Sequence, residues 1–359
     1  METSNETGNL SQELLEILEF WGEPRVSLYI SIPMTTIYVS IFITGLVGNV
    51  ITCMVIARHR HMQTATNLYL FSLAVSDLLL LFCGLPEELH KTWYSHPYVF
   101  GEAFCRARAF AAEATTCASI LTITAFTVER YVAICHPLKS HTMSKLSRVA
   151  KMIIGIWLLA VVCAVPQVIP VGLVYAKLKN GTYVEGLSAC SILPEWTVYS
   201  RYSFQVSTLF FFVLPMGIIS ALYILIAAAL RRSTCNTSSV TSEGSDSDYV
   251  HKSRRTVIKM LVAVVIAFFV CWAPFHAQRL LAIHGDQMRP LDIKVYQVLT
   301  NTSGILYYMS ATINPILYHI LSAKFRKAFR VFSPFFFFAT LLPLKRNEAA
   351  LCVHDSVKL

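Results

Sequence analysis

Residues 257–283 read VIKMLVAVVIAFFVCWAPFHAQRLLAI, a stretch in which Lys259 and Arg279 carry the only full charges. An α-helix rises about 1.5 Å per residue, so about 20 apolar residues cross the roughly 30 Å of hydrocarbon in a bilayer. Six more runs of this kind lie along the chain, separated by polar connections. The seven expected spans are residues 32–57, 67–89, 104–134, 149–174, 202–230, 257–283 and 295–318. They predict an all-α membrane protein, built as a seven-transmembrane helix bundle.

The composition agrees with exposure of this bundle to lipid. Of the 359 residues, 55% are hydrophobic and 14% are charged, and the mean hydropathy is +0.55. Soluble globular proteins carry about a quarter charged residues. A large soluble helical protein is the alternative, but seven long apolar runs disfavour it. The net charge of +9 requires no nucleic-acid partner, because anionic lipid and an acidic partner surface can balance basic residues that face the cytoplasm.

Basic residues set the expected orientation. Most of the 30 Lys and Arg residues lie in the first, third and fifth connections and in the C-terminal segment, and basic residues remain cytoplasmic. The C-terminus is therefore expected inside the cell and the N-terminus outside, in a multi-pass protein of the plasma membrane. The expected segments are 1–31, extracellular; 32–321, the seven-span domain, with a third cytoplasmic loop near 231–255; 322–332, an amphipathic eighth helix on the membrane surface; and 333–359, a cytoplasmic tail.

Two kinds of residue on the outer side predict covalent modification. Asn5, Asn9 and Asn180 each begin an Asn-X-Ser/Thr sequence on that side, so glycosylation is expected there. Cys105 and Cys190 also fall on the outer, oxidising side, and one disulfide between them is expected.

Each span carries a short sequence motif of its own. In chain order they are Gly48-Asn49, Leu73-Ala74-Val75-Ser76-Asp77, Cys105 with Glu129-Arg130-Tyr131, Trp157, Pro215 with Tyr223, Cys271-Trp272-Ala273-Pro274 and Asn314-Pro315-Ile316-Leu317-Tyr318. Together they resemble the rhodopsin-like class of G-protein-coupled receptors, from about Gly48 to Phe332. The resemblance implies a receptor that signals to a heterotrimeric G protein, with arrestin and receptor kinases as further cytoplasmic partners and membrane lipid around the bundle.

The resemblance also implies roles at the cytoplasmic end. Glu129 would hold Arg130 at rest and release it toward the G protein on activation. The alternative is an arginine that extends to the membrane interface. Leu138 would enter an apolar notch on the G protein. Tyr131, Tyr223 and Tyr318 belong to the same activation motifs.

The middle of the bundle carries two further expected sites. Pro274 and Pro315 are expected to kink their helices and give rigid segments a place to pivot. The residues that match the family's core switch, and that would also serve as ordinary core packing, are Ile120, Pro215, Phe268 and Trp272.

Asp77 is a carboxylate near mid-membrane, where an unpartnered polar group is costly. Side chains that could surround it are Asn49, Ser119, Ser310 and Asn314. The family suggests a bound sodium ion with water there, held by Asp77, Ser119 and Asn314. A protonated, hydrogen-bonded aspartic acid is the alternative, and no other cofactor is expected.

Two residues that this chain lacks and two glutamates that it has restrict the class of ligand. Amine receptors of this class carry an Asp where Ala112 stands, and opsins carry a retinal-linked Lys where Tyr308 stands. Glu88 and Glu113 are expected to face inward near the outer mouth of the bundle. Either Glu113 forms an internal salt bridge with Arg279, or a ligand guanidinium docks between the two glutamates in a charge-assisted contact.

Three more side chains would complete such a pocket. His276 projects from the sixth span toward the same region as Arg279. Tyr307 and Tyr308 could cover an apolar ligand side chain.

Shorter segments of the sequence resemble one particular family within this class. Residues 268–280 resemble the neuromedin U receptor family, and residues 122–131 and 141–145 are similar to insect pyrokinin receptors. That family implies an amidated peptide ending in Pro-Arg-X-amide, with the acidic positions at Glu88 and Glu113 and the basic one at Arg279, and signalling through Gq and calcium. Relatives that bind CAPA-type Pro-Arg-Val-amide peptides share these charges, so the subtype stays open.

Two other classes of function are disfavoured. A transporter would be expected to show inverted repeats and broken paired helices, and the sequence has neither. An enzyme would need a convergent nucleophile or metal set. The scattered histidines His59, His61 and His136 show no metal-ligand pattern.

Overall fold

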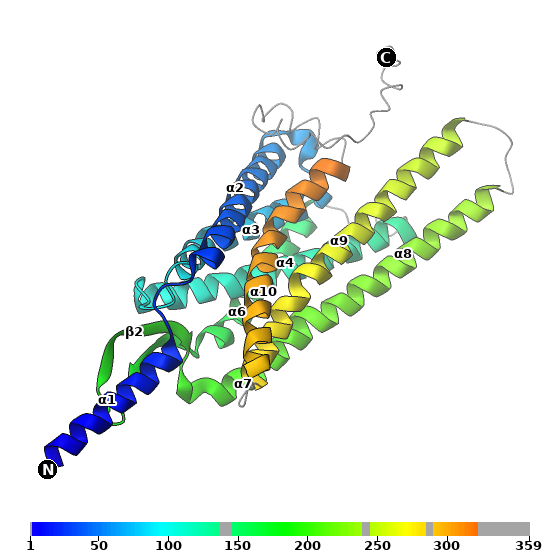
Figure 1. Ribbon diagram of the computed structural model, residues 1–359. Helices are drawn as coiled ribbons and strands as arrows, with labels where there is room; N and C mark the ends of the chain where they lie inside the picture. The colour runs from blue at the N-terminus through cyan, green and yellow to red at the C-terminus, as the bar shows by residue number, and fades with distance from the viewer. Residues whose placement is uncertain (1, 137–145, 239–244, 285–289, 322–359) are drawn as a thin grey trace.

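The computed structural model describes residues 2–136, 146–238, 245–284 and 290–321, and within them the side chains of 11–136, 146–229, 263, 265–283 and 295–317. Long helices dominate it (Figure 1). In chain order they are α1 (Glu2–Trp21), α2 (Leu28–Arg58), α3 (Ala65–Lys91), α4 (Gly101–Cys135), α6 (Leu146–Val168), α7 (Thr197–Thr208), α8 (Leu214–Ser238), α9 (Ser245–His284) and α10 (Pro290–Leu321).

The predicted seven-helix bundle is confirmed, and every expected span has its helix. The fifth span is composite, because α7 continues through a π-helix, η3 (Leu209–Val213), into α8. Among the described residues, six segments are long and apolar enough to cross a membrane, from α2 to the part of α9 between Val265 and Ile283. Helix α10 completes the bundle by packing against α9, α2 and α3.

Several helix ends differ from the expected boundaries. The expected third cytoplasmic loop, 231–255, contains the last turns of α8, which continues to Ser238, and the first turns of α9, which begins at Ser245. The hydrophobic run marks the part of a helix that lipid surrounds, whereas backbone hydrogen bonds carry the helix beyond it. In Figure 1, α8 and α9 run side by side and project past the other helices. Leu138 and the predicted eighth helix, 322–332, lie outside the described residues.

Helix α6, the fourth span, ends before the expected boundary because its apolar run continues into a strand. Helix α6 stops at Val168, and residues expected to be helical up to 174 begin β1 (Val171–Lys177). It pairs antiparallel with β2 (Tyr183–Ile192), and Leu173 lies opposite Cys190. Apolarity alone does not distinguish a helix end from a strand. Asn180-Gly181, with Gly181 at φ 87°, is the turn signal that predicts this hairpin.

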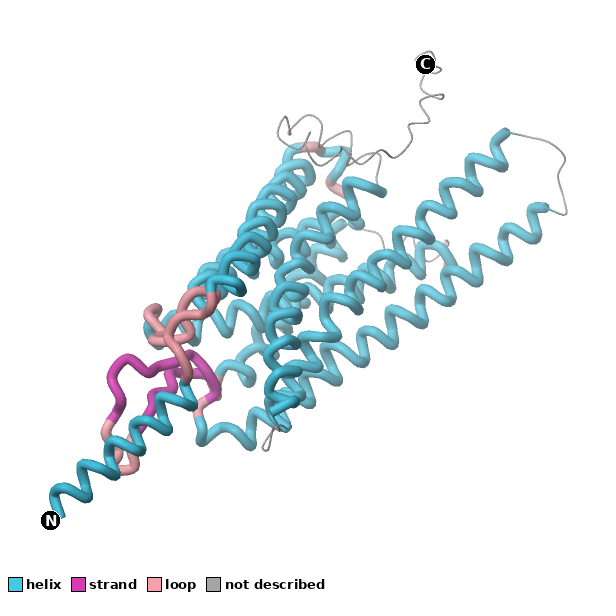
Figure 2. Tube along the Cα trace, in the orientation of Figure 1, coloured by secondary structure: helices cyan, strands magenta, loops and turns pink. Residues whose placement is uncertain are grey.

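The hairpin and α1 lie together at one end of the molecule, which we call the hairpin end (Figure 2). The disulfide Cys105–Cys190 is confirmed, with Cα atoms 5.8 Å apart, and it ties β2 to the start of α4. Neither α1 nor the hairpin was expected from the sequence. The α1 segment is linked to the hairpin by Glu13, whose carboxylate accepts the backbone N–H of Lys179.

Three prolines lie within the long helices of the fifth, sixth and seventh spans. Pro274 and Pro315 lie inside α9 and α10, as expected. Pro215 follows the π-helix, whose Leu209 carbonyl accepts the N–H of Leu214, five residues on. A proline supplies no backbone donor, so a wider turn just before it is a common accommodation.

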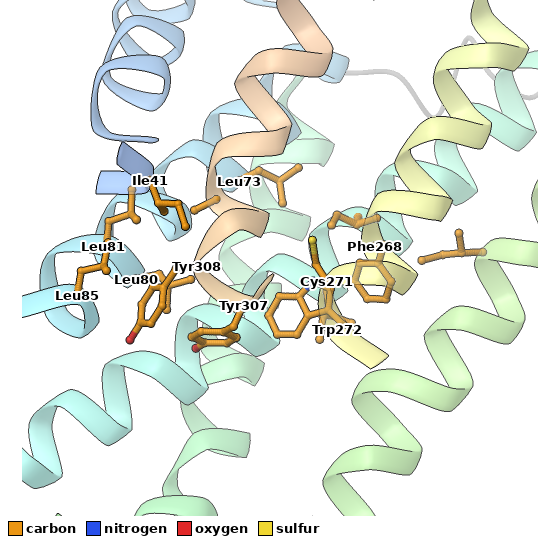
Figure 3. Close-up of a cluster of buried hydrophobic side chains, with 14 of the residues drawn as sticks. Ile41, Leu73, Leu80, Leu81, Leu85, Phe268, Cys271, Trp272, Tyr307 and Tyr308 are labelled. Atoms are coloured by element: carbon orange, nitrogen blue, oxygen red, sulfur yellow. The ribbon is translucent and has the colours of Figure 1, made fainter. Parts of the chain in front are cut away.

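A buried apolar cluster fills the centre of the bundle (Figure 3). Ile120, Phe268 and Trp272 belong to it and are almost fully buried, and Pro215 is buried nearby. The Phe268 and Trp272 rings lie 5.9 Å apart. The expected core-switch residues therefore share one packed environment between α4, α8 and α9.

Candidate functional site

Glu113 of α4 and Arg279 of α9 form an ion pair near the hairpin end. The distance from Arg279 Nη1 to Glu113 Oε1 is 2.8 Å, and their side chains are 11% and 16% exposed. Of the two interpretations left open by the sequence, the internal salt bridge is therefore present.

Further contacts hold Arg279 in place. Its guanidinium carbon lies 3.9 Å from the centre of the Phe204 ring and 5.3 Å from that of Phe275. Its Nη2 donates to Gln167 Oε1 at 3.3 Å. Cation–π contacts are strongest where water is excluded, so Arg279 is fixed by more than its carboxylate.

Glu88, the other expected acid, also has a partner inside the protein. Arg108 Nη2 donates to Glu88 Oε1 at 2.7 Å, and Lys91 Nζ lies 3.9 Å from the same oxygen. The sequence-based interpretation missed Arg108. A charged residue inside the third apolar run, five positions before Glu113, was the available signal.

Glu87 is the second residue that the sequence-based interpretation missed. Its carboxylate is fully buried and contacts Lys91 Nζ at 2.5 Å and Arg108 Nε at 3.1 Å. The Tyr98 hydroxyl donates to it at 3.3 Å. Burial and the Glu87 carboxylate both raise the pKa of Tyr98, so this hydroxyl keeps the proton that it donates. Because a buried carboxylate needs such partners, Glu87 anchors this corner.

The rings of Phe275, Tyr307 and Tyr308 form an aromatic wall. The hydroxyls of Tyr307 and Thr116 lie 3.0 Å apart, and the Tyr307 ring stacks on Phe275 at 4.9 Å. Tyr308 meets Tyr307 edge-on at 5.1 Å. The Tyr307 hydroxyl also lies 3.4 Å from the carbonyl oxygen of Ala112, the neighbour of Glu113 in α4. Tyr307 is therefore close to the segment of α4 that carries Glu113.

His276 makes its contacts with residues of the fifth span. Its Nδ1 is 3.2 Å from Thr208 Oγ1, and its ring stacks on Phe212 at 4.8 Å. The side chain is buried. The structure thus places His276 against the fifth-span residues, with Phe275 as its neighbour in α9.

Trp272 connects this wall to the middle of the bundle. Its ring meets Tyr307 edge-on at 5.5 Å and Phe268 at 5.9 Å (Figure 3). Close-packed side chains transmit displacement because there is no free volume to absorb it. A shift of Tyr307 would therefore displace Trp272 and, with it, α9.

A small cavity lies beside Asp77, with Ser119, Ser310 and Asn314 also in its lining. Asn314 Nδ2 donates to Asp77 Oδ2 at 3.1 Å. The cavity measures about 30 Å³, and since one water occupies roughly 10–15 Å³ on this measure, about two fit. Asn49 does not line it. Its amide nitrogen donates instead to the carbonyls of Gly45 and Ala311.

Oxygen-rich lining suits a hard cation. Sodium, like other hard cations, prefers carboxylate, hydroxyl and amide oxygens. Asp77, Ser119 and Asn314 supply all three kinds around the cavity, so the residues present fit the expected ion.

Arg130 lies at the end of α4 opposite the hairpin. Its Nη2 donates to Glu129 Oε1 at 3.2 Å and to Thr66 Oγ1 of α3 at 2.6 Å. The Arg130 guanidinium also lies over Phe126, 5.4 Å from the ring centre. The contact expected between Glu129 and Arg130 is therefore present, and Thr66 adds a tether to α3.

The other residues expected at this end are described in part. The Tyr223 and Thr127 hydroxyls lie 3.3 Å apart, which joins α8 to α4. Tyr131 packs against the central cluster. Tyr318 lies in α10, and its side chain is outside the described part of the chain.

Comparisons with known proteins cover the same region. Residues 48–318 match the seven-transmembrane receptor domain of the rhodopsin family. The pyrokinin-1 receptor of Drosophila melanogaster is 43% identical, over 90% of this chain and 83% of its own length. Neuromedin-U receptor 2 of Mus musculus is 37% identical, over 91% and 80%. A neuromedin U receptor homologue of Caenorhabditis elegans is 38% identical, over 89% and 84%. The family match, residues 48–318, includes both ion-pair groups.

Proposed function

The chain belongs to the rhodopsin family of seven-transmembrane receptors, and on that premise we propose that it is a receptor for an amidated neuropeptide of the pyrokinin and neuromedin U type. Its similar relatives are receptors named for these peptides. Receptors of this family are not enzymes, and they couple to G proteins.

The observation that carries the ligand class is the pairing of each pocket glutamate with an arginine. Glu113 holds Arg279 at 2.8 Å and Glu88 holds Arg108 at 2.7 Å. Both carboxylates therefore bind a guanidinium in this structure. An amidated C-terminus is neutral, so an arginine next to it would be the main charge near the buried end of the peptide. Each carboxylate therefore has the geometry to bind a guanidinium, and a ligand arginine would bind there by taking the place of a receptor arginine.

The relay from the pocket follows the aromatic contacts. A peptide at the hairpin end bears on Tyr307, which contacts Trp272, which contacts Phe268. Pro274, inside α9, offers the pivot for that helix. At the opposite end Arg130 would leave Glu129 for the G protein, and Tyr131, Tyr223, Tyr318 and Leu138 would complete the coupling surface.

The cellular setting follows from the same proposal. The N-terminal segment and the hairpin face outward, and Asn5, Asn9 and Asn180 are glycosylated. Asn180 lies exposed in the hairpin turn. The C-terminus faces the cytoplasm, where Gq, arrestin and receptor kinases are the partners. Lipid surrounds the bundle in the plasma membrane, and Asp77, Ser119 and Asn314 hold a sodium ion.

A calcium assay in cells that express the receptor tests this function. The panel contains Pro-Arg-Leu-amide and Pro-Arg-Val-amide peptides together with the free-acid form of each. We expect one amidated series to raise calcium and the free acids to be inactive. Glu88→Gln and Glu113→Gln should each weaken the response. Glu102→Gln is the matched control, because this glutamate is exposed and pairs with Arg106 within α4.

Two results separate the levels of the proposal. Silence toward every peptide, in cells with verified surface receptor and with readouts for all G-protein classes, would overturn the ligand class. A response through another G protein, with no calcium signal, would overturn the Gq assignment alone.

A further inference from the structure

Among the described residues of the pocket, three carboxylates and three cations pair with one another before any ligand arrives. The carboxylates Glu87, Glu88 and Glu113 meet the cations Lys91, Arg108 and Arg279 in the contacts given above. A peptide arginine adds one positive charge to this group. Since a desolvated cation needs a carboxylate, an entering guanidinium must take one from a residue that already uses it.

Arg108 holds two carboxylates at once. Its Nε lies 3.1 Å from Glu87 Oε2, and its Nη2 lies 2.7 Å from Glu88 Oε1. The Arg108 side chain is 20% exposed, Glu88 is 23% exposed, and Glu87 is fully buried. Of these two acids, Glu88 is therefore the one that a ligand can reach.

Arg279 is placed differently. The described part of the chain gives it one carboxylate, Glu113, and the rings of Phe204 and Phe275 cover it. If Arg279 gave up Glu113, its charge would keep only the rings and the Gln167 amide oxygen. Arg108 can give up Glu88 and still be neutralised by Glu87, because Lys91, which shares Glu87, is 38% exposed and can be hydrated instead. The cost of releasing a carboxylate is therefore lower at Arg108.

We propose that Arg108 is an exchangeable internal counterion: the guanidinium of the ligand takes Glu88 from Arg108, while Glu87 keeps Arg108 neutralised. This inference rests on the proposed function, because it requires a peptide with an arginine near its buried end. Arg108 then limits the affinity for the ligand by competing for Glu88. Glu87 acts as a positioning residue that lowers the free-energy cost of displacing Arg108 from Glu88.

The exchange predicts opposite signs for two neutralising substitutions. Arg108→Gln removes the competitor, leaves Glu87 with Lys91 and Tyr98, and frees Glu88 for the ligand. Glu87→Gln leaves Arg108 dependent on Glu88, so the ligand would strand a largely buried charge. If Arg108 and Glu87 served only to stabilise the fold, both substitutions would weaken binding.

Homologous competition binding on membranes, with two peptides, measures this exchange. One peptide ends in Pro-Arg-Leu-amide and the other carries citrulline, a neutral isostere, in place of the arginine. The readout is the ratio of the two dissociation constants, because a lower receptor number changes the amount bound and leaves the ratio unaltered.

We expect Arg108→Gln to raise the preference for arginine by about three- to tenfold and Glu87→Gln to lower it by a similar factor. In the Glu87→Gln/Arg108→Gln double variant, the effect of Glu87→Gln should disappear, because no stranded arginine remains. Glu102→Gln should leave the ratio unchanged. Should Arg108→Gln fail to reach the membrane, Arg108→Lys is expected to raise the ratio less, since lysine lacks the fork that spans two carboxylates.

The outcomes distinguish the inference from the function beneath it. A wild-type receptor that prefers arginine, with a ratio that Arg108→Gln or Arg108→Lys leaves unchanged or lowers, overturns the exchange and leaves the proposed function standing. A wild-type receptor that binds neither peptide overturns both.

Discussion

At the hairpin end, charged side chains from α3, α4 and α9 meet in pairs, whereas the middle of the bundle is filled by apolar residues such as Ile120, Phe268 and Trp272. Ion pairs can exchange one partner for another of the same charge with little movement. Close-packed apolar groups cannot, because any change in one displaces its neighbours. The contrast teaches how recognition and relay can be separated: under the proposed function the hairpin end would select the ligand by charge, and the middle would respond by moving.

The largest expected effect comes from breaking the hairpin end alone. Cys105→Ser removes the link between β2 and α4, and loss of a native disulfide costs about 2–5 kcal/mol in small domains. We expect the affinity for the amidated peptide to fall by about 30-fold or more, together with a lower melting temperature of the purified receptor. Cys83→Ser is the control, because Cys83 is a free, partly buried thiol of α3. Wild-type binding by Cys105→Ser would contradict the role of the hairpin.

The next effect breaks the middle and spares the hairpin end. Phe268 is 4% exposed and Phe269, its neighbour in α9, is 52% exposed. Truncation of a buried phenylalanine costs about 3–5 kcal/mol. Phe268→Ala should lower the melting temperature and the maximal calcium response, with a change in peptide affinity below about threefold. Phe269→Ala should do much less, and equal losses in both variants would argue against a relay through the core.

A third prediction concerns the Asp77 cavity in the middle. If sodium binds there and favours the resting arrangement, replacing choline with sodium at constant ionic strength should weaken agonist binding by about fivefold. Asp77→Asn should abolish this dependence, because the amide removes the negative charge. Potassium serves as the ionic control. An identical sodium effect in the wild type and in Asp77→Asn would place the ion elsewhere.

The smallest effect tests the boundary between the two regions. The Tyr307 hydroxyl bonds to Thr116 at 3.0 Å, and its ring touches Trp272. Tyr307→Phe and Thr116→Val should each cost about 1 kcal/mol, as loss of one hydrogen bond does. Thermal unfolding of both single variants and the double variant gives the coupling between them. Additive losses would show that this bond contributes nothing of its own.

The sequence predicts the bundle well because lipid imposes a simple rule. Each span must be apolar over about 20 residues, so the seven runs coincide with helices. The Cys105–Cys190 disulfide was also correctly expected from its position on the oxidising side. Helix ends were less predictable, since α8 and α9 continue beyond their apolar segments.

The candidate site was only half predicted, and the reason is physical. Two alternatives were expected, a salt bridge between Glu113 and Arg279 or a ligand guanidinium between Glu88 and Glu113, but the pairing of side chains depends on which helix faces which. The contact of Arg108 with Glu87 and Glu88 joins α4 to α3, and no periodicity within one helix reveals it. The hairpin was missed although Asn180-Gly181 signalled its turn, because an apolar stretch next to a span resembles a continuation of that span.

The π-helix between α7 and α8 carries a consequence for how such receptors diverge. A residue advances an α-helix by about 100°, and η3 accommodates one extra residue within a turn. Loss of a single residue there would rotate α7, and with it the Phe204 ring under Arg279, while Ile219 and Tyr223 in α8 kept their register. One insertion or deletion could thus re-phase the recognition half of a helix and leave its signalling half untouched, so that ligand preference could evolve independently of G-protein coupling.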